Sequence, residues 1–311
     1  MWDFSRFNVS YRQHIKEREM DIVGTTAFWC AGSVANNILT KRALSICPYP
    51  FTLCLVGLLV QTIAARLSLG KKTSSSFRMR TTLPISIAVA SSFLFHRVAL
   101  MYGSVGLTIT VKSMSTVFVA LLSRRYLGET LTLSASVALG LIVLGIIVSS
   151  ASDVKFNWIC FLAASISGLS VSLKVVLNKI ALNRIGCSKN ELYYNTMSIA
   201  SLLVLPVCIL LERDAISHIQ NSQDAAISVL LSGSGLAWME IGSYALIALV
   251  TPVTHAVCNG IRSLVVIVAG VIYFKTPMPP QKMLGVGIVV FGSLLYSISK
   301  AVLSKTKKKM K

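Results

Sequence analysis

The chain has few charged residues for its length, and very few of them are acids. Charged residues make up 13% of its 311 positions, and only 11 residues are Asp or Glu. A soluble domain carries about 25% charged residues, which cover its water-facing surface. A surface in contact with lipid tails should instead be apolar. With 54% apolar residues and a mean hydropathy of +0.71, the composition excludes a soluble globular protein.

Motifs of catalysis and metal binding are also missing. The sequence has no HExxH, no GxSxG and no pair of carboxylates within an apolar segment, so we predict that it is not an enzyme. Its seven cysteines show no CxxC and no regular spacing, and most lie in apolar runs. The sequence therefore predicts no metal site, no cofactor and no structural disulfide. The net charge of +19 is scattered rather than gathered on a basic face, which argues against nucleic acid as a partner.

Long apolar runs fill most of the chain. A helix that crosses a bilayer needs roughly 20 apolar residues, and short polar loops separate about ten such runs. The sequence therefore predicts an all-α membrane protein with about ten transmembrane helices in the lipid bilayer. The predicted spans are 22–40, 47–69, 82–103, 106–123, 131–149, 156–180, 192–211, 226–249, 252–274 and 281–301.

Loop charge predicts the orientation of these spans. With the N-terminus in the cytosol, nineteen Lys and Arg residues lie on the cytosolic side and six on the other, as the positive-inside rule requires. Residues 1–21 form a polar segment without an apolar core and cleavage site, so the first span should act as an uncleaved signal anchor. An even number of spans places the basic tail, residues 302–311, in the cytosol as well.

The sequence also resembles itself after a shift of 147 residues, which places 126–150 over 273–297. Four pairs of identical residues are then aligned: Tyr126 with Tyr273, Gly140 with Gly287, Gly145 with Gly292, and Ser150 with Ser297. Two apolar helices can share such residues by chance, but this register extends across a helix, a loop and another helix. We predict two five-helix repeats, 22–150 and 151–301. The second is inverted because each has an odd number of spans.

Apart from the cations counted on the two sides, five cations and one acid lie inside the predicted spans. Each intramembrane charge costs at least about 2.5–3.5 kcal/mol on insertion scales, so such residues pair or face a polar cavity. One carboxylate cannot neutralise five bases, and the excess predicts an anionic substrate. The residues are Arg97, Lys112, Lys174, Lys179, Arg262 and Glu240.

Lys112 and Arg262 are the strongest candidates for substrate binding. Both lie in mid-span beside Ser, Thr or Asn, and the repeat places Arg262 over Ser115, three residues after Lys112. Residues three apart share a helix face, so the two cations should converge on one cavity. His255 and Asn259 lie seven and three residues before Arg262, on the same stripe of the ninth span.

The other charged residues leave alternatives open. Arg97 forms a buried pair with Glu240, holds backbone carbonyl groups, or contacts the substrate. Lys174 lies among small polar residues and is a candidate for the same site, whereas Lys179 either joins the site or snorkels to the interface. At the start of the seventh span, three polar residues could stack on or hydrogen-bond a ring of the substrate: Tyr193, Tyr194 and Asn195.

Three segments together resemble the triose-phosphate translocator and nucleotide-sugar transporter family, within the drug/metabolite transporter superfamily. They are TPVTHAVCNGIRSLVVIVAGVIYFKTPMPP (251–280), KSMSTVFVALLSRRYLGE (112–129) and FNW (156–158). The resemblance extends over residues 22–301. It implies ten helices and strict exchange of phosphate-containing anions, with the substrate-binding bases at Lys112 and Arg262 and a polar partner at His255.

One departure from this family decides between its branches. Plastid phosphate translocators usually have Lys-Arg in the ninth helix, where this chain has Arg262-Ser263. The resemblance therefore favours a nucleotide-sugar antiporter of the secretory pathway, which exchanges a nucleotide sugar for a nucleoside monophosphate. The alternative is a sugar-phosphate or triose-phosphate/phosphate exchanger. A non-transporting membrane trafficking factor is a remote alternative, and homodimer formation is left open.

The C-terminal residues suggest a cellular location. Lys308 and Lys309 stand four and three positions from the end, like the dilysine signal that a coat-protein receptor reads to return proteins to the endoplasmic reticulum. The alternative is a basic tail held near anionic lipid. We expect residence in the endoplasmic reticulum or Golgi, with a plastid-type membrane as the alternative.

Overall fold

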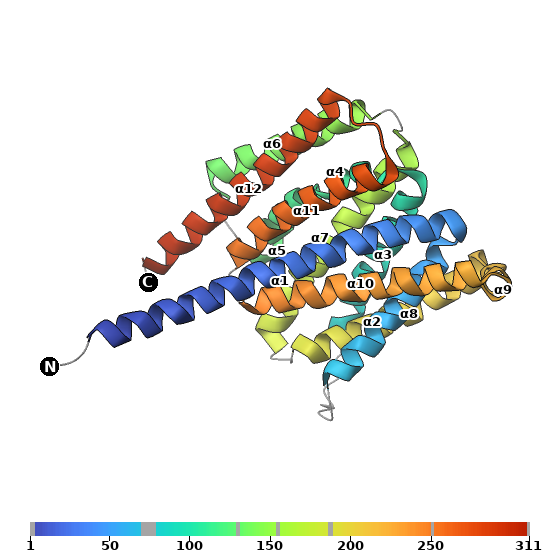
Figure 1. Cartoon of the computed structure of the whole chain (residues 1–311), viewed down its shortest axis with the longest axis horizontal. Helices are drawn as coiled ribbons and strands as arrows, with labels where there is room; N and C mark the ends of the chain where they lie inside the picture. Colours follow the sequence, from blue (N-terminus) through green and yellow to red (C-terminus); the bar gives the residue numbers. More distant parts are fainter. Residues whose placement is uncertain are drawn as a thin grey trace.

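The computed structural model describes residues 4–69, 79–128, 131–153, 156–185, 189–249 and 252–309, and it describes side chains mainly over 21–67, 79–153, 156–181, 190–243 and 258–300. All regular structure in these ranges is α-helical (Figure 1). The helices are α1 (Phe4–Ile46), α2 (Pro50–Leu69), α3 (Met79–Tyr102), α4 (Val105–Lys112), α5 (Ser115–Leu127), α6 (Leu133–Ala151), α7 (Trp158–Ile185), α8 (Lys189–Leu211), α9 (Ala215–Asn221), α10 (Gln223–Leu249), α11 (Pro252–Phe274) and α12 (Pro280–Lys309).

Each predicted span coincides with helical structure. Eight segments of the described chain are long and apolar enough to cross a membrane, and the described apolar part of α11, Cys258–Phe274, is shorter. The fourth predicted span, 106–123, is divided into α4 and α5, and α9 is an additional short helix. The prediction of an all-α membrane protein is confirmed.

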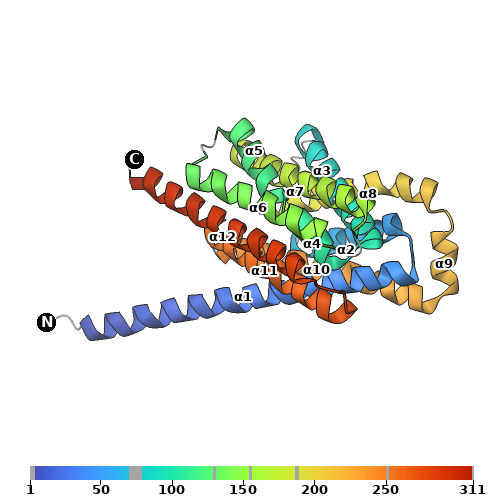
Figure 2. The same ribbon diagram turned by 90° about the horizontal axis from the view of Figure 1, so that it is seen from above.

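Helix α1 is longer than the first predicted span. It contains 43 residues and begins at Phe4, so it continues the polar N-terminal segment that we predicted as a separate part. No Pro or Gly lies between residues 4 and 23 to interrupt it. At 1.5 Å per residue it is about 65 Å long, and Figure 2 shows it projecting beyond the bundle. The start of α1 and the end of α12 lie at one end of the bundle, here called the proximal end, and α9 lies at the distal end (Figure 1).

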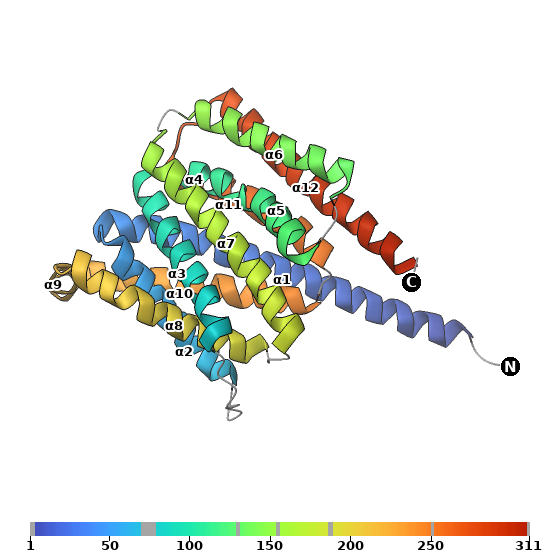
Figure 3. The ribbon, with the colours of Figure 1, turned by 180° about the vertical axis from the view of Figure 1, so that it is seen from behind.

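The helices pack in pairs that are far apart in sequence. The most extensive pairs are α6 with α12, α1 with α10, α3 with α7, and α2 with α8 (Figure 3). Large apolar side chains such as Leu133 and Ile272 face outward, whereas polar side chains such as Gln61 and Ser167 are fully buried. This distribution is the reverse of that in a soluble protein, and it suits a bundle whose outer surface contacts lipid.

Small residues bring the backbones of α6 and α12 into contact. A methyl group added at Gly145 would lie 2.7 Å from the Gly285 carbonyl oxygen. One added at Gly292 would lie 3.0 Å from the Ala138 carbonyl oxygen. Membrane helices associate through such close packing because lipid provides no hydrophobic driving force between them. A larger side chain at these positions must therefore push the two helices apart.

Charged residues at the distal end stabilise the ends of neighbouring helices. The Glu212 carboxylate, after α8, accepts hydrogen bonds from the backbone N–H groups of Phe51 (3.0 Å) and Thr52 (2.7 Å) at the start of α2. Lys41 of α1 donates to the Gly103 carbonyl (2.8 Å) just after α3. Both contacts place a charge where the helix macrodipole favours it. Residues that sequence analysis treated only as loop charges thus join separate helices.

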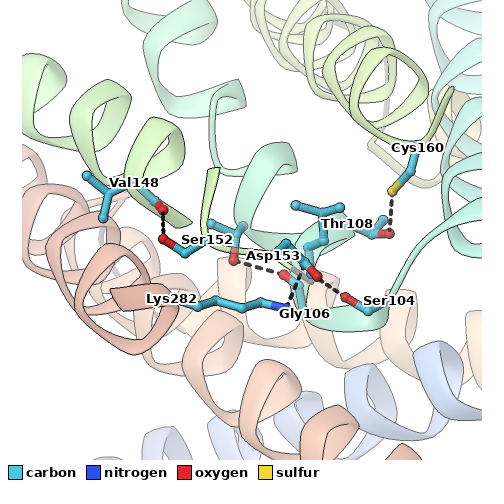
Figure 4. Close-up of polar contacts among 10 residues, drawn as sticks. Ser104, Gly106, Thr108, Val148, Ser152, Asp153, Cys160 and Lys282 are labelled. Atoms are coloured by element: carbon cyan, nitrogen blue, oxygen red, sulfur yellow. Dashed lines mark hydrogen bonds and ion pairs between the residues drawn. The ribbon is translucent and has the colours of Figure 1, made fainter. Parts of the chain in front are cut away.

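A buried ion pair also lies at the distal end. Lys282 Nζ, at the start of α12, lies 2.6 Å from Asp153 Oδ2, just after α6, and the two side chains are 1% and 2% exposed (Figure 4). Figure 4 also shows Asp153 close to Gly106 at the start of α4. The sequence analysis counted Lys282 only as one of the six cations on the side opposite the N-terminus. Its burial was not predicted, because it depends on a partner 129 residues away.

The contact between α6 and α12 can be tested with two glycines of one helix. Gly285→Ala should lower the free energy of unfolding by about 1–3 kcal/mol, since the methyl group would collide with the backbone nitrogen of Ser149. Gly287→Ala is the matched control, because nothing lies within 4 Å of a methyl group there. Thermal unfolding in detergent, followed by tryptophan fluorescence, measures both. Equal melting temperatures for the two variants would contradict the described packing.

Breaking the ion pair on one side should destabilise the protein strongly. Asp153→Asn leaves the Lys282 charge buried without its partner and should cost about 3–5 kcal/mol, whereas Asp153→Leu combined with Lys282→Met should recover much of the loss. Arg42→Met removes an exposed cation at the same end and should leave stability unchanged. Thermal unfolding in detergent measures the stability of all these variants. A single variant as stable as the wild type would show that the pair is not desolvated.

Candidate functional site

Lys112 lies at a break in the fourth span. Helix α4 ends at this residue and α5 begins at Ser115. Between them the backbone tightens, because the N–H of Met114 donates to the Val111 carbonyl (3.0 Å) and the N–H of Thr116 donates to the Ser113 carbonyl (3.0 Å). These are bonds over three residues rather than four. Ser113 and Met114 keep right-handed helical backbone angles, so the fourth span continues through this tightened turn from Val105 to Tyr126.

Helix α7 packs against this turn between α4 and α5. Its Gly168 has no side chain, and a methyl group there would lie 3.3 Å from the Lys112 carbonyl oxygen. One turn later, the Ser172 hydroxyl donates to the Ser115 carbonyl (2.9 Å) and to the Gly168 carbonyl (2.7 Å). The two residues hold α7 directly against the turn between α4 and α5.

Arg262 on α11 is fixed by two neighbours. Its Nε and Nη2 donate to Oδ1 of Asn259, at 3.1 and 2.9 Å. Its Cζ lies 5.0 Å from the centre of the Trp29 ring, which belongs to α1. The structure thus brings together Arg262 and Asn259, as their spacing on one stripe predicts, and it adds an aromatic platform that the sequence analysis did not anticipate. A stacked guanidinium keeps donors free for a ligand.

The charged residues of several helices interact at this level. Lys112 of α4 interacts electrostatically with Arg262 of α11, Lys174 of α7 and Glu240 of α10. Arg262 also interacts with Glu240. We call these four residues the cation cluster. Helices α4 and α11 are in direct contact, which agrees with the predicted convergence of their two bases.

The two lysines of α7 differ in their surroundings. Lys174 is half-buried, and its Nζ lies 5.6 Å from the centre of the Phe93 ring of α3. Lys179, more than one turn further along, is exposed. The structure therefore places Lys174 in the cation cluster and leaves Lys179 at the outer surface.

The polar residues at the start of α8 lie against α2. The Tyr193 hydroxyl donates to Oε1 of Gln61 (3.0 Å), and the Tyr194 ring lies 6.0 Å from the Arg66 guanidinium. Asn195 is half-buried. The contacts described for the two tyrosines join α8 to α2, and none of them is with the cation cluster.

His96 is a residue that the sequence analysis missed. It lies on α3, is 7% exposed, and its Nδ1 has no hydrogen-bond partner among the described residues. It interacts electrostatically with Lys112, Arg97 and Arg262. An unsatisfied buried polar atom beside cations is a position where water or a ligand group can bind. The signal in the sequence was a His next to an Arg within the apolar run FLFHRVAL.

Arg97 is held by hydroxyl groups. Its Nη1 donates to the hydroxyls of Ser232 (2.9 Å) on α10 and Thr40 (3.4 Å) on α1. It is 2% exposed. The predicted pairing with Glu240 is not among the contacts of the described residues. Arg97 therefore joins three helices beside the cation cluster.

Three predicted residues lie where no side chain is described. The backbone of His255 belongs to the first turn of α11, and those of Lys308 and Lys309 belong to the end of α12. Their predicted roles stay predictions.

Residues 20–297 match the model of the Triose-phosphate Transporter family. The phosphoenolpyruvate/phosphate translocator 1 of Arabidopsis thaliana chloroplasts is 32% identical over 90% of this chain and 72% of its own length. The non-green-plastid triose phosphate/phosphate translocator of Brassica oleracea is also 32% identical, over 90% of this chain and 73% of its own length. The chloroplast triose phosphate/phosphate translocator of Flaveria trinervia is 27% identical, over 91% of this chain and 72% of its own length.

A solved crystal structure shares the fold. It superposes with a TM-score of 0.60 over 88% of this chain and 98% of its own, at 12% identity. This likeness concerns the arrangement of helices alone.

Proposed function

Because this chain belongs to the Triose-phosphate Transporter family, we propose that it exchanges small phosphate-containing metabolites for inorganic phosphate across a membrane. The observation that carries the proposal is the cation cluster. Lys112 of α4 lies on a helix that contacts both α11, which carries Arg262, and α7, which carries Lys174, so positive charge is in excess within the membrane. A phosphate group compensates that excess through charge-assisted hydrogen bonds.

The relatives favour this function over the nucleotide-sugar antiporter that the sequence analysis placed first. They are phosphate translocators for phosphoenolpyruvate and triose phosphate. The nucleotide-sugar interpretation depended on Ser263 in place of a second cation. In the structure Lys174 provides another base in the cation cluster, so Ser263 alone no longer argues against a phosphate carrier.

We also propose that the chain consists of two inverted five-helix repeats, 22–150 and 151–301. The contact between α6 and α12 supports this division. A methyl group at Gly145 would meet residues 285 and 289, and one at Gly292 would meet residues 138 and 142, so a shift of 147 residues turns one set of contacts into the other. The packing of α1 with α10 likewise corresponds to that of α7 with α3.

The exchange follows from electrostatics in this proposal. The site between the repeats opens alternately to each side. Closing it around the empty cation cluster is costly, because Lys112, Lys174 and Arg262 repel one another in a medium of low dielectric constant. A bound phosphate lowers that cost, so the carrier reorients only when it is loaded.

Removing either principal base should abolish exchange. Lys112→Ala and Arg262→Ala should each reduce phosphate exchange by roughly 100-fold, since each removes a charged partner of the phosphate. Arg262→Lys should also be damaging, because a lysine cannot form two parallel bonds. Uptake of labelled phosphate into phosphate-loaded proteoliposomes measures the effect. Arg125→Ala, an exposed cation at the end of the same span, is the control.

Normal exchange by Lys112→Ala or Arg262→Ala would remove that residue from the site. Wild-type protein that exchanges no phosphate-containing anion would sink the proposed function and leave the trafficking-factor alternative.

The membrane in which the protein resides is a separate question. The relatives' names favour a plastid-type membrane, whereas Lys308 and Lys309 predict retrieval to the endoplasmic reticulum by a coat-protein receptor. Changing both lysines to Ser should move a retrieved protein to later Golgi membranes, as fluorescence microscopy of a tagged chain would show. If the double variant keeps the wild-type distribution and the protein co-localises with a plastid marker, the plastid location is supported instead.

A further inference from the structure

Trp29 is the aromatic neighbour of the principal base on α11. It lies on α1 and is 4% exposed, and the centre of its ring lies 5.0 Å from the Arg262 Cζ. Arg262 is half-buried, so its guanidinium borders accessible space while the ring that it faces does not. A cation over an aromatic ring is attracted by the negative face of that ring, and Trp is the strongest such partner. The ring therefore restrains the position of the guanidinium.

The other contacts of Arg262 leave a particular set of its donors without a partner. Nε and Nη2 both donate to Oδ1 of Asn259, one turn earlier on α11. A guanidinium has five N–H donors in a fixed fork. The two donors of Nη1 and the second donor of Nη2 have no partner in the part of the chain that the structure describes. Nη1 and Nη2 form one edge of the guanidinium, and such an edge can bind a phosphate through two parallel hydrogen bonds.

Helix α11 directs Arg262 to the interior of the bundle. The neighbouring Ile261 and Val265 are exposed on the outer surface, whereas Val266, one turn after Arg262, is buried. Lys112 lies on α4, and α4 is in direct contact with α11. The guanidinium is thus on the side of α11 that faces the other helices, and its orientation there decides which of its edges a ligand meets.

Packing from two helices fixes the Trp29 ring. Helix α1 runs between α10 and α11 (Figure 1). On the side of α10, a methyl group at Gly242 would lie 2.9 Å from the Trp29 Cα, so glycine lets the two backbones approach. Trp29 packs with Leu246 of α10 and Cys258 of α11, which are both buried. The Cys258 sulfur also lies 3.6 Å from the hydroxyl of Thr26, one turn before Trp29. The ring therefore has little freedom to move.

We propose that Trp29 is a positioning residue for phosphate binding, because its ring restrains the Arg262 guanidinium so that the edge formed by Nη1 and Nη2 is presented to the phosphate. This inference rests on the phosphate exchange proposed above. A free arginine side chain has large rotamer freedom, and a base that is already ordered loses less of that freedom when it binds. Removing the ring weakens phosphate binding although every charged group remains. Turnover at saturating phosphate stays close to that of the wild type.

The first test measures phosphate/phosphate exchange by the purified full chain in proteoliposomes. Trp29→Leu should raise the KM for inorganic phosphate by about five- to tenfold, with kcat within about twofold of the wild type. Trp29→Phe restores a ring face and should recover most of the loss. Gly242→Ala pushes α10 against Trp29 without altering the ring or the base, and it should also raise the KM. Trp158→Leu is the control and should keep the wild-type KM, because that ring is 68% exposed on the outer surface.

Fluorescence distinguishes positioning from simple packing. Replacing Trp2, Trp158 and Trp238 by Phe leaves Trp29 as the only one of the four tryptophans. An anion that binds the guanidinium changes the electric field at the ring that faces it. The emission maximum of this variant should therefore shift saturably as inorganic phosphate is added, with half-saturation near the KM of the same variant. A ring that only fills space between helices would show no such shift.

Exchange by the wild type separates this inference from the proposed function. If the wild type exchanges phosphate and Trp29→Leu keeps the wild-type KM, or loses kcat at an unchanged KM, the positioning role is refuted and the carrier function stands. If the wild type exchanges no phosphate, both fail. Should Trp29→Leu not fold, the variant that retains only Trp29 decides. Emission that does not change with phosphate would then overturn the inference.

Discussion

Positive charge that the protein cannot neutralise by itself is the constraint around which the interior is arranged. Lys112, Lys174 and Arg262 meet inside a bundle whose outer surface is apolar, and Glu240 offsets only one of them. The surroundings provide partial compensation through the amide oxygen of Asn259 and the ring faces of Trp29 and Phe93. None of these neighbours removes a full charge, so the site stays suited to an anion.

Other charges in the same bundle show the contrast. Lys282 has a carboxylate at 2.6 Å, and the Glu212 carboxylate accepts two backbone N–H groups. Arg97 donates to two hydroxyls. The charges of Lys282 and Glu212 are compensated within the protein, whereas the described partners of Arg97 are neutral, and all three residues join helices together. What distinguishes a binding residue from a structural one here is the completeness of its partners rather than its depth in the membrane.

This distinction explains how far the sequence could predict the molecule. The spans follow from apolar runs, and the convergence of Lys112 with Arg262 follows from the internal repeat, because both depend on local periodicity. The break after Lys112 does not, since it requires Gly168 and Ser172 of another helix to hold the turn. The burial of Lys282 likewise depends on Asp153, and the importance of His96 depends on three residues from two other helices and its own. Pairings across the bundle that the internal repeat does not relate have no signature in a single sequence.

The contacts of Glu212 and Lys41 have a consequence for the resting protein. One joins the start of α2 to the end of α8, and the other joins α1 to the end of α3, all at the distal end. A carrier that admits solute through that end must expose these charges and helix termini to water in one movement. In the described conformation these two contacts therefore fasten the distal ends of α1, α2, α3 and α8 to one another.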